Sequence, residues 1–105
     1  YETRRNRVVA ALKAIAGVTC EMPEGAFYAY PGIASLIGGL SGGGRVLTDD
    51  VAFAEALLDE AHVATVPGSA FGYSPYLRLS CAASDAQLDE ACERISRFVE
   101  KIRPA

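Results

Sequence analysis

The sequence is poor in the side chains that bind metals or form disulfides. Its 105 residues include one histidine, His62, and three cysteines, Cys20, Cys81 and Cys92. No two cysteines form a C-x-x-C pair, and a zinc site needs about four ligands, so we expect no metal site. Unpaired thiols at long spacings are typical of a reducing compartment, which favours a cytoplasmic location.

Charge and hydropathy exclude two further classes of partner. The net charge is −3, whereas nucleic-acid-binding domains usually carry a basic excess. No apolar run approaches the ~20 residues that span a bilayer, and no charged-then-apolar signal segment opens the chain. We therefore predict neither a nucleic-acid partner nor a membrane partner.

The length and the hydrophobic content fit one globular domain over residues 1–105. Half of the residues are hydrophobic and 22% are charged, an ordinary balance for a folded domain. Tyr1 is not a natural initiator, so we expect this domain to be a fragment of a longer protein.

Hydrophobic periodicity predicts three helices. In the first, over residues 4–16, apolar side chains recur at i, i+3, i+4 and i+7. Thr48 is expected to cap the second, whose buried stripe would comprise Phe53, Leu57, Leu58 and Ala61. Ser84 and Gln87 form a capping box that starts the third.

Four strands are predicted between these helices, at residues 18–22, 26–30, 63–66 and 76–82. Short links within each pair of strands favour antiparallel pairing. We predict an α+β fold of two layers, in which a small antiparallel or mixed sheet has its helices packed on one face.

The glycine-rich stretch at residues 38–44 invites comparison with a phosphate-binding loop. A P-loop ends in Lys-Ser or Lys-Thr, but Arg45 and Val46 follow the last glycine here. We interpret the stretch as a flexible surface excursion.

The strand at residues 76–82 alternates between apolar and polar side chains. Leu77 and Leu79 must face the helices, which places Arg78 on the opposite face. Arg78 is then either a solvent-facing arginine in a salt bridge or a fork that binds a carboxylate bidentately. The alternation favours neither alternative over the other.

Five segments occur in a fixed order along the chain. They are Pro23-Glu24-Gly25-Ala26-Phe27-Tyr28, Leu57-Leu58-Asp59-Glu60-Ala61, Val63-Ala64-Thr65-Val66-Pro67-Gly68-Ser69-Ala70-Phe71-Gly72, Leu77-Arg78-Leu79-Ser80 and Glu93-Arg94-Ile95-Ser96-Arg97-Phe98. In this order they resemble the C-terminal domain of class I aminotransferases, which depend on pyridoxal phosphate. The resemblance covers essentially the whole chain, and the stretch from Tyr30 to Thr48 is similar to the aspartate aminotransferase branch.

The resemblance implies one specific site residue. Arg78 matches the family arginine that grips the substrate α-carboxylate, with Phe71 as a second candidate; Ser69 and Tyr73 lie on the same loop. It also implies that the catalytic lysine and the other ligands of pyridoxal 5'-phosphate belong to a large domain outside this chain. The two lysines here, Lys13 and Lys101, lie on charged helix flanks near the chain ends and not in an apolar pocket, so the isolated chain is predicted to be inactive.

The resemblance further implies a homodimeric parent enzyme that transfers an amino group between an amino acid, with aspartate favoured, and a 2-oxo acid such as 2-oxoglutarate. Aromatic or alanine-type substrates are the alternative within the family. From a different class, a standalone α+β ligand-binding regulatory module stays open, because a fold does not fix a function. A reading frame that continues upstream of Tyr1 by a further domain would favour the aminotransferase.

Overall fold

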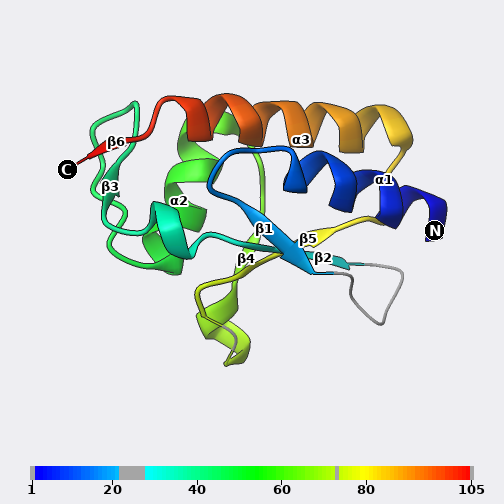
Figure 1. The fold of residues 1–105 in the computed structure, drawn as a ribbon, viewed down its shortest axis with the longest axis horizontal. Coiled ribbons are helices and arrows are strands. Elements are labelled where there is room, and N and C mark those ends of the chain that lie inside the picture. Colours follow the sequence, from blue (N-terminus) through cyan, green and yellow to red (C-terminus); the bar gives the residue numbers. More distant parts are fainter. Residues whose placement is uncertain (1, 22–27, 73, 105) are drawn as a thin grey trace.

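A computed structural model describes residues 2–21, 28–72 and 74–104. Its main sheet has four strands in the order β1-β2-β5-β4, and every neighbouring pair is antiparallel (Figure 1). The elements of this sheet are β1 (Thr19–Glu21), β2 (Tyr28–Gly32), β4 (Val66–Pro67) and β5 (Leu77–Ser80). The helices are α1 (Glu2–Lys13), α2 (Asp50–Ala61) and α3 (Asp85–Glu100), with 3-10 turns η1 (Ala34–Leu36) and η2 (Gly68–Phe71).

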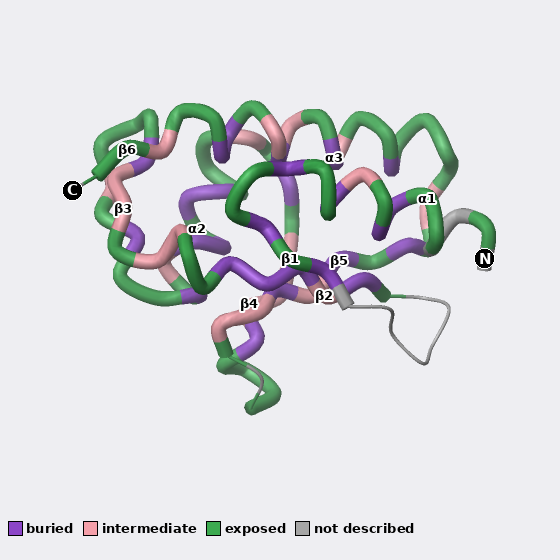
Figure 2. Tube along the Cα trace, in the orientation of Figure 1, coloured by how far each residue is buried: buried purple, intermediate pink, exposed green. Residues whose placement is uncertain are grey.

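Two layers enclose the core. Helices α1 and α3 run side by side along one face of the sheet, and α2 packs against α3 and β4 (Figure 1). The buried segments of α1 and α3 lie on their sheet-facing sides, whereas their outer sides are exposed (Figure 2). The predicted α+β class is therefore confirmed. None of the helices in the described parts of the chain is long and apolar enough to cross a membrane.

The helix predicted over residues 4–16 is observed as Glu2–Lys13, and α3 starts at its predicted local signal. The Ser84–Gln87 capping box is present, because the Gln87 amide donates to Ser84 Oγ and the Ser84 amide donates to Gln87 Oε1. The prediction that Thr48 caps α2 was wrong: Asp49 is the cap, and its carboxylate accepts from the Ala52 amide at 2.8 Å. The Asp49 carboxylate, one residue after Thr48, thus satisfies a free amide in the first turn of α2.

The predicted buried stripe of α2 was wrong at Leu58, which is 51% exposed. The helix instead buries Phe53, Ala54, Ala56 and Leu57. At about 100° per residue these four positions span one side of the helix, and Leu58 lies past the edge of that side.

Two strands are shorter than predicted, and β2 runs past the predicted end to Gly32. At the predicted strand 63–66, Val63 is buried but pairing starts only at Val66, and 76–82 contracts to Leu77–Ser80. Parts of the predicted strands 18–22 and 26–30 lie outside the described residues.

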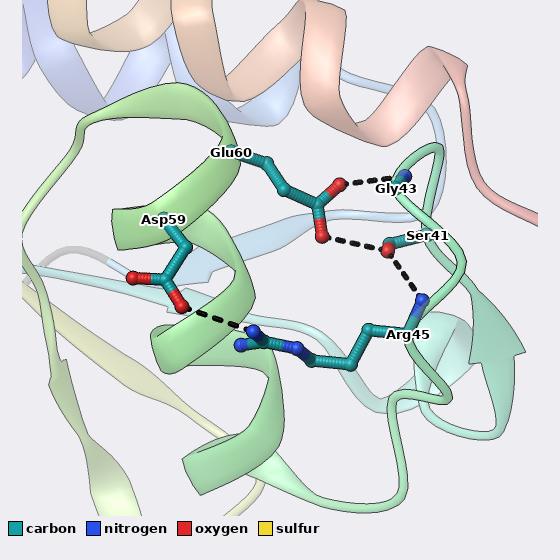
Figure 3. A network of polar contacts seen from close by, with 5 residues as sticks. All are labelled: Ser41, Gly43, Arg45, Asp59 and Glu60. Atoms are coloured by element: carbon teal, nitrogen blue, oxygen red, sulfur yellow. Dashed lines mark hydrogen bonds and ion pairs between the residues drawn. The ribbon is translucent and has the colours of Figure 1, made fainter.

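The glycine-rich stretch has more regular structure than an excursion would. Strand β3 (Gly39–Leu40) pairs antiparallel with β6 (Arg103–Pro104), an addition that the sequence did not predict. The Glu60 carboxylate of α2 accepts from Ser41 Oγ and from the Gly43 amide, each at 2.8 Å (Figure 3). These donors are therefore used within the fold, unlike the free amides of a phosphate-binding loop.

Candidate functional site

Arg78 lies on β5, which is hydrogen-bonded to β2 on one side and β4 on the other. Its neighbours Leu77 and Leu79 are 2% and 5% exposed and belong to the core beneath the helices. Alternation along the strand turns Arg78 toward the face that α1 and α3 leave open, as the sequence predicted. The register pairs Tyr28 with Ser80 and Arg78 with Val66, so Tyr28 lies on this same open face.

Two aromatic rings flank the guanidinium of Arg78. Its central carbon lies 4.4 Å from the centroid of the Tyr28 ring and 5.5 Å from that of Phe71. The Tyr28 and Phe71 side chains are themselves 37% and 41% exposed. Within the described ranges no carboxylate forms an ion pair with Arg78, so the contacts do not support the salt-bridge alternative.

The turn η2 carries Phe71 to this face. It ends at Gly72, whose φ of 74° lies in the left-handed region that glycine adopts without strain. At its start, the Gly68 amide donates to the Tyr76 carbonyl at 2.6 Å, which ties the turn to the residue before β5. The Phe71 ring also meets Tyr30 edge-on, with centroids 6.2 Å apart. Tyr73, which the sequence placed on the same loop, lies outside the described residues.

One residue of this region was missed by the sequence analysis. Asp50 is 1% exposed, and its Oδ2 accepts from the Ser69 amide of η2 at 2.8 Å. Its position in the first turn of a helix suggested only an interaction with the helix dipole. No local pattern could have shown a contact to a residue 19 positions away.

The arrangement suits an anionic, planar ligand. A guanidinium offers a rigid fork of donors that matches the two oxygens of a carboxylate, and flanking rings restrict the side chain before the ligand arrives. The open face thus presents a cation whose charge is not neutralised by a described neighbour.

The thiols and lysines do not contribute to this face. Cys20, Cys81 and Cys92 are all buried. Burial, with a smaller contribution from Asp89, raises the pKa of Cys92 to about 11, so its thiol is neutral near pH 7 and a poor nucleophile. Lys13 and Lys101 are exposed, at the end of α1 and just after α3, helices that cover the opposite side of the sheet.

A second hollow lies elsewhere, between the glycine-rich stretch and α3. Its volume is about 480 Å³, and Gly43, Glu60, Arg94, Arg97 and Lys101 line it. Arg94 pairs with Glu90 and Arg97 with Glu93 along the helix, while Glu60 binds the Gly43 amide. Because most of its charges are already paired, it is a weaker candidate than the face around Arg78.

The described residues thus form a two-layer α+β domain whose open sheet face carries an arginine that no described carboxylate pairs with. The model of the family "Aminotransferase class I and II" matches residues 1–95, and the chain belongs to this family. The predicted resemblance, including its aspartate aminotransferase branch, is confirmed.

Two similar proteins carry aspartate in their names, and a third, at lower identity, is named for aromatic substrates. An aspartate/prephenate aminotransferase of Cereibacter sphaeroides is 54% identical over 93% of this chain and 24% of its own length. The crystal structure of the aspartate aminotransferase from Rhizobium meliloti superposes with a TM-score of 0.92 at 46% identity, over 96% of this chain and 25% of that one. The structure of an aromatic aminotransferase from Pyrococcus horikoshii superposes with a TM-score of 0.76 at 38% identity, over 95% of this chain and 24% of that one. The chain thus spans about a quarter of the length of these relatives.

The family depends on pyridoxal phosphate, and the described residues do not fit that cofactor. Its aldehyde needs a lysine beside the substrate site, but neither lysine of this chain is on the face that carries Arg78.

Proposed function

We propose that this chain is the C-terminal domain of a pyridoxal-phosphate-dependent aminotransferase, and that Arg78 binds the α-carboxylate of its amino-acid and 2-oxo-acid substrates. The observation that carries the proposal is the guanidinium held between the Tyr28 and Phe71 rings, with no carboxylate of the described residues paired to it. Family membership supports it, because the α-amino acids and 2-oxo acids of the proposed reaction all carry an α-carboxylate.

The rest of the enzyme would supply the cofactor, which carries the carbanion chemistry when bound. The domain described above would hold the carboxylate and close over the substrate, which expels water and orients the reacting bond. Phe71 and Tyr28 would narrow the range of guanidinium orientations. The parent would be a cytoplasmic homodimer.

We propose aspartate and 2-oxoglutarate as the substrates, because the names of the relatives at 54% and 46% identity include aspartate. The Cereibacter name adds prephenate, a second acceptor to assay. An aromatic donor is the alternative, supported by the Pyrococcus structure at lower similarity. The role of Arg78 is common to all of these.

Single-turnover kinetics of the full-length enzyme test the role of Arg78. Arg78→Ala should weaken aspartate and a neutral amino acid by similar factors, on the order of 30-fold to several thousand-fold, because it removes one partner of a desolvated charge pair. Cofactor absorbance should stay normal. Unchanged kinetics with both substrates would end the proposal, and a loss confined to aspartate would make Arg78 a reader of the side chain instead.

A further inference from the structure

Asp50 is a buried carboxylate without a cationic partner among the described residues. It is 1% exposed, and its Oδ2 accepts a hydrogen bond from the Ser69 amide at 2.8 Å. Burying a carboxylate is costly unless its oxygens are hydrogen-bonded. The position therefore needs an explanation beyond ordinary packing.

Capping of α2 does not supply that explanation. Asp49 already caps the helix, since its carboxylate accepts from the Ala52 amide at 2.8 Å. Favourable interaction with the helix dipole would be available to an exposed carboxylate in the first turn. What burial adds at Asp50 is the contact with η2.

That contact fixes the turn on which Phe71 stands. Ser69 is the second residue of η2, and Phe71 is its last. Phe71 is 41% exposed. Besides the Arg78 guanidinium, its ring contacts the Tyr30 ring, edge to face. Its place 5.5 Å from the Arg78 guanidinium thus depends on how firmly the η2 backbone is held.

We propose that Asp50 is a positioning residue for substrate binding, which acts through the Ser69 amide and Phe71 on the guanidinium of Arg78. This inference rests on the proposed role of Arg78 as the carboxylate-binding group. A charge-assisted hydrogen bond from a backbone amide to a carboxylate is stronger than a neutral one, which suits the task of holding a short turn.

The test uses the full-length enzyme with Asp50→Ala, and Asp49→Ala as the matched control. Asp50→Ala should raise the substrate dissociation constant about fivefold, by freeing the turn, while the single-turnover rate at saturation changes less than about twofold. Asp49→Ala removes a carboxylate from the adjacent position and lowers thermal stability, but it should leave the dissociation constant unchanged. Asp50→Asn keeps an acceptor for the Ser69 amide and should fall between wild type and Asp50→Ala.

The Arg78→Ala background separates this inference from the proposed function. In that background Asp50→Ala should weaken binding no further, because its effect passes through the missing guanidinium. If the losses of binding free energy add in the double variant, or if Asp49→Ala weakens substrate binding as much as Asp50→Ala, the role of Asp50 is overturned and that of Arg78 stays intact. If Arg78→Ala by itself leaves binding unchanged, the proposed function fails. Should Asp50→Ala not fold, Asp50→Asn against Asp49→Asn decides by the same criteria.

Discussion

Two arginines in this domain, Arg45 and Arg78, illustrate how differently the same side chain is used. Arg45 directly follows the glycine-rich stretch and binds Asp59 at 2.9 Å, while its backbone amide donates to Ser41 Oγ (Figure 3). Arg78 lies on an ordinary alternating strand and contacts two aromatic rings. Arg45 is held by partners within its own chain, whereas no described carboxylate pairs with Arg78. The proposed binding role of Arg78 therefore rests on its partners and not on the composition of its segment.

The largest effect should come from Arg78→Lys, with Arg45→Lys as the matched comparison. Arg78→Lys keeps the charge but loses the planar fork, so kcat/KM of the full-length enzyme should fall roughly 10- to 100-fold, the worth of one charge-assisted hydrogen bond. Arg45→Lys should leave kcat/KM unchanged, because Asp59 accepts equally well from an ammonium. Steady-state kinetics of the two variants check the comparison, and equal losses would contradict it.

Glu60→Ala should produce the next largest effect, on stability. The variant removes the acceptor for Ser41 Oγ, which is 2% exposed as a residue, and for the Gly43 amide. We expect the free energy of unfolding to drop by about 2 kcal/mol, measured by urea denaturation of the 105-residue chain. Glu55→Ala, an exposed glutamate on the same helix, is the control and should stay within about 0.5 kcal/mol of wild type.

Removing one ring beside Arg78 should have a smaller effect. Tyr28→Leu deletes a cation–π contact with a centroid distance of 4.4 Å at a partly exposed site. Such contacts contribute about 0.5–1 kcal/mol, so substrate binding should weaken roughly two- to fivefold. Tyr28→Phe retains the ring and should bind substrate normally. If its binding weakens as much as that of Tyr28→Leu, the hydroxyl rather than the ring is responsible. Titration of a dicarboxylate inhibitor measures the difference.

Arg45→Ala should have the smallest effect of the series. Its ion pair with Asp59 is solvated, with the two side chains 39% and 60% exposed. Surface pairs of this kind contribute about 0–1 kcal/mol. Arg45 also keeps one buried guanidinium nitrogen without a described partner, and its removal offsets part of the loss. A midpoint of thermal unfolding within a few degrees of wild type is the expected result.

Features that depend on near neighbours in the sequence could be predicted. The Ser84–Gln87 capping box spans four residues and formed as expected, and the alternation of Leu77, Arg78 and Leu79 placed the arginine on the open face. The error at Thr48 is also local. Two capping-competent residues stand side by side, and the chain used Asp49.

Features that join distant segments could not be predicted. Strand β3 meets β6 across more than 60 residues, and Asp50 meets Ser69 across 19, with no periodicity or motif that marks either contact. Phe71 was a candidate only through the resemblance, because an aromatic residue on a loop has no intrinsic direction. The rings around Arg78 came together only when β2, β5 and η2 assembled.

The central place of β5 in the sheet has a dynamic consequence. Because β2 and β4 both bond to this strand, the backbone that carries Arg78 has neighbours on either side, and it cannot shift without breaking two ladders. Amide hydrogens of β5 should therefore exchange with solvent among the slowest in the domain, opening only in near-global unfolding. Substrates of different size would then be accommodated by motion of the whole domain and by the torsions of one long side chain.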